Sequence, residues 1–280
     1  MTIPIPSVTS LLKQYGLRAK KGLGQHFLSA MPTVDKIVKT LNLDAKEDVL
    51  EIGPGLGVLS AKIASHVHAI FAIETDIRAC EIIKTEFSHI KNLHLIHKDI
   101  LKLKLKDELI DLRYPVKVVG NIPYNITSPI LFWLVENKNM ISSAFLMTQK
   151  ELADRIVAPP NSKTYGALSI MIQARACVKK IFNVSAASFI PPPKVSSSVI
   201  KIDFQNPPDL GIKDWKVFEK VVRTAFQKRR KTIKNALSDI TLPSHYASIE
   251  DVLNKCKIKI QRRPETLSLQ EFADLANMLV

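Results

Sequence analysis

Residues 48–57 read DVLEIGPGLG, a short apolar segment that runs directly into three closely spaced glycines. The apolar residues of 48–52 predict a buried strand, and residues 58–64 are expected to form a helix. Glycines allow the backbone to come close to a ligand, and the amino terminus of a helix favours negative charge. A strand, a glycine turn and a helix in this order predict the nucleotide-binding start of a Rossmann-like βαβ unit.

Acidic residues stand at the ends of the next two predicted strands. The strand at 70–73 ends in Glu74, about 20 residues after the glycine turn, where an acidic side chain accepts hydrogen bonds from ribose hydroxyls. A strand at 93–96 is followed by Asp99, whose carboxylate can accept a hydrogen bond from an adenine amino group. Open α/β sheets bind their ligands at the carboxyl ends of their strands. We therefore expect one nucleoside site that is lined by Gly53, Gly55, Glu74 and Asp99.

The fourth predicted strand, residues 116–119, runs into the sequence GNIPY at 120–124. Pro123 prevents the strand from continuing, so the chain must turn out at the carboxyl end of the sheet. The amide oxygen of Asn121 and a nearby backbone carbonyl can accept both hydrogens of an exocyclic amine, and the ring of Tyr124 can stack on a flat heterocycle. This stretch predicts a site that holds a nucleobase by its amino group. The alternative is an ordinary turn at the end of a strand.

The spacing of the glycines indicates which cofactor the predicted site binds. A dinucleotide fingerprint needs Gly or Ala where this chain has Val58. Glu51 before the turn and the GxGxG spacing favour S-adenosylmethionine, which carries no phosphates. A nicotinamide-dependent oxidoreductase remains an alternative, but Val58 and the stretch 120–124 disfavour it.

Composition and charge indicate the kind of partner. The 280 residues carry 40 Lys and Arg against 26 Asp and Glu, a formal net charge of +14, which points to nucleic acid before membrane. No apolar run approaches the roughly 18 residues that span a bilayer. We expect a large α/β domain at 1–205, with a basic amino-terminal arm at 1–24, and a small helical RNA-binding domain at 206–280. The arm also resembles a transit peptide faintly.

Cysteines and histidines indicate neither disulfides nor a metal. The three cysteines lie far apart without a CxxC pair, so we expect reduced thiols and a cytoplasmic protein. The seven histidines do not cluster with metal-ligand spacing. We expect no metal.

Residues 218–226 have the apolar spacing of an amphipathic helix, and a basic run follows at 228–231. No acidic residue occurs between Arg223 and Leu237. A charge run is usually a solvated face, but a run of one sign on a helix in so basic a chain indicates a surface that binds phosphates. The predicted RNA-binding residues are Arg223, Lys228, Arg229, Arg230, Lys231 and Lys234.

Five motifs together carry a family resemblance: GQHFL at 24–28, EIGPGLG at 51–57, GNIPYNI at 120–126, NSKTYG at 161–166 and FIPPPKV at 189–195. With them the chain resembles the ribosomal RNA adenine dimethyltransferases, and within that family the small-subunit (KsgA/RsmA) enzymes. The resemblance implies a class I methyltransferase fold, α/β with helices on both faces of the sheet. It also implies that S-adenosylmethionine is used to dimethylate N6 of two adjacent adenosines in the 3′-terminal hairpin loop of small-subunit (16S) rRNA. The partner would be the immature 30S subunit, and we expect a monomer.

The resemblance also assigns residues. The family's cofactor contacts match His26, Leu28, Gly53, Glu74, Asp99 and Asn121, although His26 stands where Asn is frequent. In the catalytic stretch Asn121, Ile122, Pro123 and Tyr124, the oxygen of Asn121 and the carbonyl of Ile122 would hold the target amine. From the residues themselves, we expect Tyr124 to stack on one side of the base and Phe189, just before three prolines, on the other. The alternative for Phe189 is an aromatic residue of the core.

Two further alternatives remain. The large-subunit adenine methyltransferases linked to macrolide resistance share the Asn-Ile-Pro-Tyr site, although residues 54–57, 165–166 and the three prolines favour the small-subunit enzymes. A ribosome-assembly factor that keeps the fold without the activity is also possible, but such a protein has no need of Asn121, Tyr124 and the glycine turn.

Overall fold

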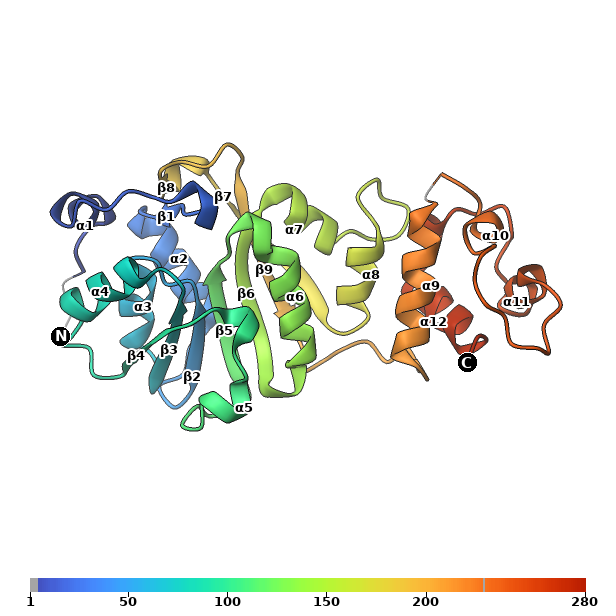
Figure 1. Ribbon diagram of the computed structural model, residues 1–280, viewed down its shortest axis with the longest axis horizontal. Coiled ribbons are helices and arrows are strands. Elements are labelled where there is room, and N and C mark those ends of the chain that lie inside the picture. Colours follow the sequence, from blue (N-terminus) through green and yellow to red (C-terminus); the bar gives the residue numbers. More distant parts are fainter. Residues whose placement is uncertain (1–4, 229) are drawn as a thin grey trace. The chain divides into compact units, whose positions relative to one another are not determined.

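The computed structural model describes residues 5–228 and 230–280, and Figure 1 labels its elements. The chain forms two compact units. One contains the chain up to Ala153 together with Lys179–Gln205, and the other contains Asp154–Val178 and Asn206–Val280. The boundary expected from the sequence lies between residues 205 and 206, so the structure differs in the segment Asp154–Val178, which belongs to the second unit. This segment carries Arg175, whose guanidinium pairs with Glu219 of the second unit at 2.6 Å.

A seven-stranded sheet forms the centre of the first unit, with the order β4-β3-β2-β5-β6-β9-β7. The first five strands in this order are parallel, and β9 is antiparallel to β6. The strands are β2 (Asp48–Ile52), β3 (Ala69–Glu74), β4 (Leu93–His97), β5 (Val116–Asn121), β6 (Ile141–Gln149), β7 (Cys177–Val184) and β9 (Ser197–Asp203). The predicted strand at 48–52 is therefore confirmed, whereas β7 was not predicted.

A second, two-stranded sheet pairs β1 (Phe27–Leu28) with β8 (Phe189–Ile190). It joins two segments of the predicted motifs that lie far apart in the sequence. The helices up to residue 156 are α1 (Val8–Gln14), α2 (Met31–Leu41), α3 (Val58–Ala64), α4 (Ile77–Glu86), α5 (Leu105–Glu108), α6 (Thr127–Glu136) and α7 (Lys150–Ile156). Short 3₁₀ turns lie at Lys21–Leu23, Ile100–Lys102, Tyr124–Ile126, Lys138–Met140, Ala186–Ser188 and Pro264–Thr266.

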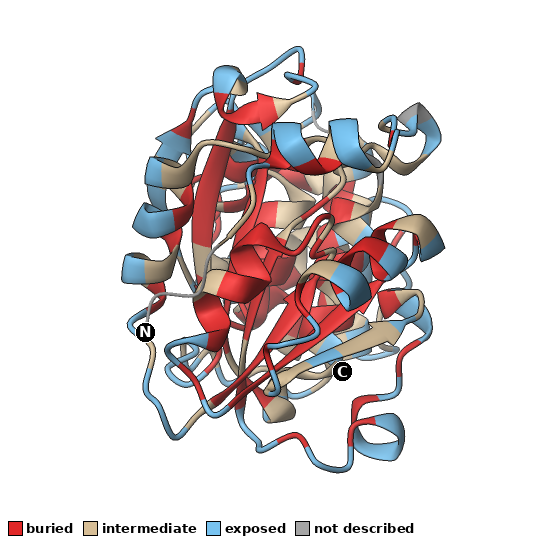
Figure 2. Ribbon diagram, turned by 90° about the vertical axis from the view of Figure 1, so that its left-hand side faces the viewer, coloured by how far each residue is buried: buried red, intermediate tan, exposed pale blue. Residues whose placement is uncertain are grey.

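The core of the first unit lies between the sheet and the helices on its faces. Every residue of β2 and of β3 is buried, as expected for parallel strands that helices cover on both sides. Figure 2 shows these strands as a buried centre with helices on either side, whose outer turns are exposed. Helix α2 contributes Val34, Ile37 and Leu41 to the core, at the spacing of one helical face.

The second unit is helical and contains α8 (Ala167–Gln173), α9 (Trp215–Gln227), α10 (Ile233–Ala236), α11 (Ile249–Lys255) and α12 (Leu269–Asn277). Helix α9 begins at Asp214, whose carboxylate accepts the N–H groups of Lys216 and Val217. Its apolar face, Phe218, Val221, Val222 and Ala225, is fully buried, which confirms the predicted amphipathic helix. The helix ends at Gln227, however, so the basic run after it does not continue the helix.

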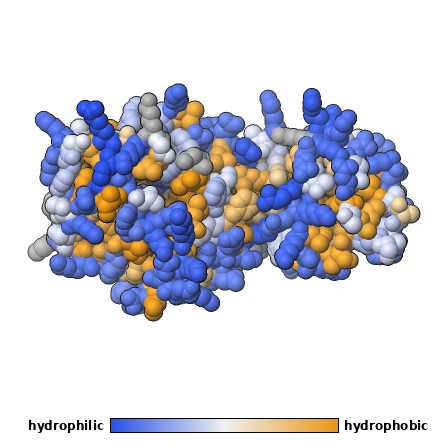
Figure 3. All heavy atoms as spheres, viewed as in Figure 1, coloured by the Kyte–Doolittle hydropathy of each residue, from blue (hydrophilic) through white to orange (hydrophobic). Residues whose placement is uncertain are grey.

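Among the residues that the structure describes, no helix is both long enough and apolar enough to cross a membrane. Hydrophilic side chains cover much of the surface of each unit in the view of Figure 3.

Candidate active site

An open cavity of the first unit lies at the carboxyl ends of β2, β3 and β5. Its volume is about 1070 Å³, including the solvent at its mouth. Its wall includes residues 23–28, the glycine turn, the end of β3, residues 98–100 after β4 and the stretch 121–124. The predicted cofactor and base residues that line it are His26, Leu28, Gly53, Gly55, Glu74, Asp99, Asn121, Ile122, Pro123 and Tyr124.

The glycine turn forms the floor of this cavity. Gly53 and Gly55 have φ angles of +68° and +59°, in the left-handed region that glycine adopts without strain. A Cβ atom at Gly55 would also lie 3.1 Å from the ring of Phe27. Larger residues would therefore both strain the turn and crowd the wall.

Gly120 is required for a different reason, because β5 and β2 come close together here. A Cβ atom at Gly120 would lie 2.8 Å from the carbonyl oxygen of Ile52 and 2.7 Å from Cδ1 of Ile122. Glycine at this position allows the strand to deliver Asn121 to the edge of the sheet beside the glycine turn.

Glu74 is a buried carboxylate in the cavity wall, with only 7% of the residue exposed. One oxygen accepts the N–H groups of Thr75 (2.8 Å) and Asp76 (2.9 Å), and the other accepts the N–H of Gly55 (3.0 Å). Burial raises the pKa of Glu74, although these backbone hydrogen bonds act in the opposite direction. A carboxylate has further lone pairs, which can accept the hydroxyl groups of a ribose.

Glu51 is more deeply buried, at 2% exposure, and also lines the cavity. Its pKa is raised to about 7, chiefly by burial and also by the negative charge of Glu74, while the hydrogen bond from the Ser60 hydroxyl at 2.5 Å acts in the opposite direction. This carboxylate can therefore change its charge near neutral pH, next to a ligand.

Asp99 lies two residues after β4 and is partly exposed. Its Oδ1 accepts the N–H of Leu101 at 3.0 Å, which holds the carboxylate at the start of a short 3₁₀ turn. Asp99 and Ile100 both line the cavity, so a carboxylate and an apolar side chain lie where the adenine of a cofactor is expected.

The side chain of Asn121 has a defined orientation. Its Nδ2 lies 2.9 Å from the backbone carbonyl oxygen of His26. Because a carbonyl oxygen only accepts hydrogen bonds, the nitrogen of the amide must face His26, and Oδ1 is the end left for a ligand. The tertiary structure thus presents an acceptor to the cavity.

Aromatic rings lie next to this amide. The rings of His26 and Tyr124 are stacked with centroids 5.9 Å apart, and the Tyr124 hydroxyl lies 3.0 Å from that of Ser197. Nδ1 of His26 lies 2.7 Å from the carbonyl oxygen of Pro191, so Nδ1 carries a proton. Hydrogen bonds at both edges therefore fix a flat aromatic surface beside Asn121.

The backbone of the catalytic stretch is also anchored. The N–H of Ile122 donates to the carbonyl of Met147 at 3.0 Å, and its side chain is buried. The carbonyl of Pro123 accepts the hydroxyl of Thr127 at 3.2 Å. These contacts keep residues 121–124 in one conformation at the cavity.

Phe189 lies elsewhere than expected. Only 2% of it is exposed, it belongs to the core cluster of the first unit, and it does not line the cavity. Its pairing with Leu28 in the two-stranded sheet places the ring in the core. In this structure the ring is not available to stack on a base.

The predicted RNA-binding residues lie in the second unit. Arg223 is exposed on α9, and Arg230 and Lys231 are exposed in the turn that follows it. Two of the cations are paired with acidic residues from farther along the chain: Lys228 with Asp239 at 2.6 Å, and Lys234 with Glu250. Arg229 lies outside the described residues.

Three polar residues around the cavity, Gln25, Thr75 and Asp76, were assigned no role from the sequence. Gln25 and Thr75 line the cavity, and Nε2 of Gln25 donates to the carboxylate of Asp76 at 2.8 Å. Asp76 follows Glu74 by two residues, but no pattern in the sequence pairs it with Gln25.

The residues of the cavity fit S-adenosylmethionine. Buried carboxylates at Glu51 and Glu74 suit the cofactor's positive charge and its ribose hydroxyls, and the turn from Gly53 leaves room for close approach of a ligand. With the sheet order β4-β3-β2-β5-β6-β9-β7, this site defines a class I S-adenosylmethionine-dependent methyltransferase.

Comparisons with known proteins narrow this class. The family model of the ribosomal RNA adenine dimethylases matches residues 16–277. "Ribosomal RNA small subunit methyltransferase A" of Alkaliphilus oremlandii is 38% identical over 272 residues, covering 96% of this chain and 94% of the relative. The protein of the same name from Enterococcus faecalis is 37% identical and covers 99% of this chain and 96% of the relative.

Solved structures agree. A dimethyladenosine transferase from Plasmodium falciparum superposes with a TM-score of 0.76 at 26% identity, covering 89% of this chain and 96% of that one. The 23S rRNA methyltransferase ErmE has a TM-score of 0.68 at 24% identity, covering 90% and 99%, and supports the fold alone.

This chain belongs to the ribosomal RNA adenine dimethylase family. The predicted family, the predicted α/β methyltransferase fold and the predicted class of enzyme, an S-adenosylmethionine-dependent rRNA adenine dimethyltransferase, are confirmed.

Proposed function

We propose that this chain dimethylates N6 of two adjacent adenosines in the 3′-terminal hairpin loop of small-subunit (16S) rRNA, using S-adenosylmethionine, on the immature 30S subunit. The observation that carries the proposal is Asn121, whose Nδ2 is held at 2.9 Å by the carbonyl of His26, so that Oδ1 is directed to a ligand. The names of the relatives support the small subunit as the substrate.

Asn121 and Ile122 would hold the target amine. N6 of adenine is a poor nucleophile because its lone pair is delocalised into the ring. If Oδ1 of Asn121 and the carbonyl of Ile122 accept its two N–H groups, the nitrogen is drawn towards tetrahedral geometry and its lone pair leaves the plane of the ring. The bound cofactor supplies an electrophilic methyl group. This chain's contribution is positioning and electrostatics.

The protons need no strong base. Once methylated, N6 carries a positive charge and two hydrogens, both of which become acidic, and one of them leaves to solvent water. The monomethylated product keeps one N–H, so one of the two acceptors can hold it for a second transfer. Tyr124 stacks on the base, which must leave its neighbours to enter, and unstacking costs least in a hairpin loop.

Pro123 has a supporting role in the proposal. It ends β5, and its carbonyl is anchored by Thr127, so it keeps Ile122 and Tyr124 on the same side of the cavity. Phe189 is not assigned to stacking, because its ring lies in the core.

The second unit would hold the RNA backbone. Arg223, Lys228, Arg230, Lys231 and Lys234 lie in or near α9 and α10, and phosphate contacts of this kind position RNA without reading its sequence. Arg229 belongs to the same proposal by its place in the sequence. We propose that the protein acts as a monomer in the cytoplasm, where ribosomal subunits are assembled and where its free cysteines Cys80, Cys177 and Cys256 remain reduced.

The test is to incubate the protein with undermodified 30S subunits and labelled S-adenosylmethionine, and then to map dimethyladenosine in the rRNA. We expect label in two adjacent adenosines of the 3′-terminal hairpin, and none in purified 50S subunits. Label in the 50S subunit alone would favour the large-subunit enzymes. Binding to 30S without any label would favour an assembly factor.

A further inference from the structure

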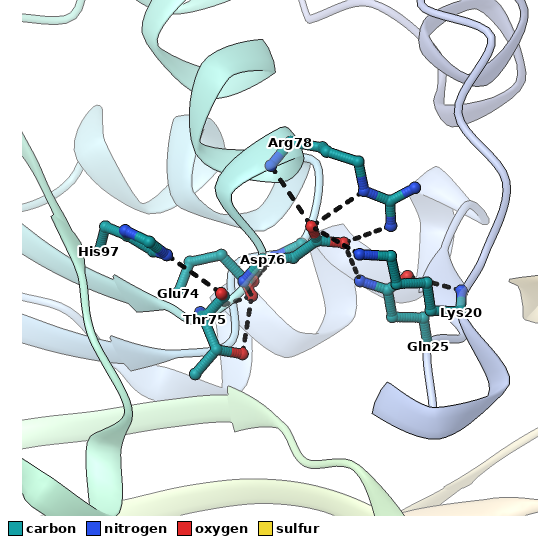
Figure 4. Close-up of polar contacts among 8 residues, drawn as sticks. Lys20, Gln25, Glu74, Thr75, Asp76, Arg78 and His97 are labelled. Atoms are coloured by element: carbon teal, nitrogen blue, oxygen red, sulfur yellow. Dashed lines mark hydrogen bonds and ion pairs between the residues drawn. The ribbon is translucent and has the colours of Figure 1, made fainter.

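Asp76 is a buried carboxylate directly behind the cavity wall. It begins α4 and does not line the cavity. The guanidinium of Arg78 donates to both of its oxygens, at 3.0 and 2.6 Å. Nε2 of Gln25 donates to Oδ2 at 2.8 Å, and Nζ of Lys20 lies 3.8 Å from Oδ1. Figure 4 shows Asp76 between Arg78 on one side and Gln25 and Lys20 on the other. The hydrogen bonds from Arg78 lower the pKa of Asp76 to about 2, so it stays ionised at neutral pH.

Gln25 uses both ends of its amide. Its Oε1 accepts the backbone N–H of Lys20 at 2.8 Å, while its Nε2 donates to Asp76. The first hydrogen bond joins the two ends of the turn at residues 20–25. The second fastens this turn to the start of α4, 51 residues farther along the chain.

The residue after Gln25 makes the contact that orients the proposed amine-binding amide. The carbonyl oxygen of His26 accepts Nδ2 of Asn121 at 2.9 Å. A path of contacts therefore runs from Asp76 through Gln25 and His26 to Asn121.

The path continues at its other end. The backbone N–H of Asp76 donates to Oε1 of Glu74, and Oε2 of Glu74 accepts the N–H of Gly55. A series of contacts thus runs beside the cavity from the glycine turn to Asn121. Within it, Asp76 connects Glu74, the carboxylate proposed to bind ribose, with the segment that carries His26.

We propose that Gln25 and Asp76 are positioning residues that hold the carbonyl of His26 in place and thereby fix which end of the Asn121 amide faces the target amine. The proposal rests on the role of Asn121 in the proposed function. If the His26 carbonyl moves, the amide of Asn121 can rotate and present N–H groups to an amine that itself offers N–H groups. Such a complex cannot hold N6.

The first test separates positioning from cofactor binding. We expect Gln25→Ala to lower kcat about 10-fold and to change the cofactor Kd by less than about 3-fold, because small misplacement of a reacting group costs rate rather than ground-state binding. Lys20→Ala is the matched control: it removes an exposed ammonium 3.8 Å from Asp76 but keeps the backbone N–H that Gln25 accepts. It should leave both quantities unchanged. If Gln25→Ala raises the cofactor Kd by as large a factor as it lowers kcat, the proposal is overturned.

The second test asks whether Gln25 acts through Asn121. Gln25→Ala and Asp76→Ala should each lower kcat, and the double variant should lose no more than the stronger single variant. In an Asn121→Ala background, Gln25→Ala should have no further effect on the residual rate. Additive losses in either combination overturn the proposal.

A third readout does not depend on Asn121. In the folded protein, trypsin should cleave after Lys20 about 10-fold faster in Gln25→Ala than in the unaltered chain, because the turn is no longer fastened to α4. Unchanged cleavage overturns the link between Gln25 and Asp76. Full turnover of Asn121→Ala, together with faster cleavage of Gln25→Ala, would overturn the amine-binding role of Asn121. The link between Gln25 and Asp76 would then still hold.

Discussion

The cavity of the first unit and the basic segment 223–234 of the second unit both carry charged groups, but the protein holds them in different ways. In the cavity Glu51 and Glu74 are buried, and Glu74 is fixed by three backbone N–H groups. In the basic segment Arg230 and Lys231 are exposed in a turn. Removing one partner of a buried charge is costly, because the charge is left without compensation away from water. The interactions of an exposed charge are weaker, because water and salt screen them. We therefore expect single changes in the cavity to be severe and those in the basic segment to be mild.

The strongest test of this contrast is Asn121→Ala. It removes the oxygen that holds the target amine, and we expect methyl transfer to fall about 1000-fold, comparable to the loss of a donor that stabilises a transition state. Cofactor titration by calorimetry should show a Kd within about 3-fold of that of the unaltered protein, because Glu74 and Asp99 remain. Asn137→Ala is the matched control, since its amide also donates to a backbone carbonyl, that of Trp133, at the end of α6. Unchanged turnover of Asn121→Ala would remove Asn121 from the mechanism.

The next prediction concerns the dependence of stability on pH. The folded-state pKa of Glu51 is raised from 4.5 to about 7, so the folded protein favours the protonated carboxyl. This contribution to stability is fully present below pH 4.5 and is lost as pH rises through about 7. We expect the free energy of unfolding to lose about 3 kcal/mol as the pH rises from below 4.5 to above 7.

The corresponding variant is Glu51→Gln, whose amide oxygen can still accept the hydroxyl of Ser60. Urea unfolding of both proteins between pH 5 and pH 8.5 should show the variant gaining stability relative to the unaltered chain as pH rises. A difference that is constant with pH would mean that Glu51 does not titrate in this range. No comparable effect is expected from Arg230→Gln, because that side chain is exposed.

Glu74→Ala should chiefly weaken cofactor binding. Hydrogen bonds to a charged group contribute about 1.5–3 kcal/mol, so we expect the cofactor Kd to rise roughly 30-fold. At saturating cofactor, turnover should recover to within about 3-fold of that of the unaltered chain. Glu136→Ala, an exposed acid on α6, is the control for the loss of a negative charge. A turnover loss at saturating cofactor as large as the change in Kd would argue against a binding role for Glu74.

The smallest effects are expected in the basic segment. Replacing both Arg230 and Lys231 with Ala should weaken binding to the rRNA about 10-fold and reduce the slope of log Kd against log salt by about 1 to 2. Lys228 and Lys234 are the comparison pair, because Asp239 and Glu250 already neutralise them. Replacing both of these lysines with Ala should weaken binding to the rRNA less. Equal losses for the two pairs, or none for either, would contradict a phosphate-binding surface centred on residues 230 and 231.

The sequence predicted much of the first unit. The strand at 48–52 and the helix at 58–64 have the predicted bounds, because a continuous apolar run and the glycines next to it leave little choice. Strand β7 was missed because its residues are mostly exposed and include Lys179 and Lys180, which weaken the apolar signal. Helix α1 was missed because only Val8 and Leu11 are buried, in a segment that otherwise resembles a basic loop.

Two expectations failed where side-chain direction depends on distant segments. Phe189 precedes three prolines and was expected to be exposed to a base, but pairing with Leu28 places it in the core. The basic segment 223–234 was expected to continue the helix through residue 231. Folding brings Asp239 and Glu250 to two of its lysines, and the helix ends at Gln227.

By itself, the sequence determined the family, the strand, glycine turn and helix at 48–64, and most of the predicted residues that line the cavity. These depend on local patterns and on motifs with fixed spacing. Only the tertiary structure decided how those residues are held. Which end of the Asn121 amide faces the ligand depends on the carbonyl of His26, and the position of that carbonyl depends on Gln25 and Asp76. Hydrogen bonds between residues 51 and 95 positions apart form only in the folded chain, so no local pattern could have predicted them.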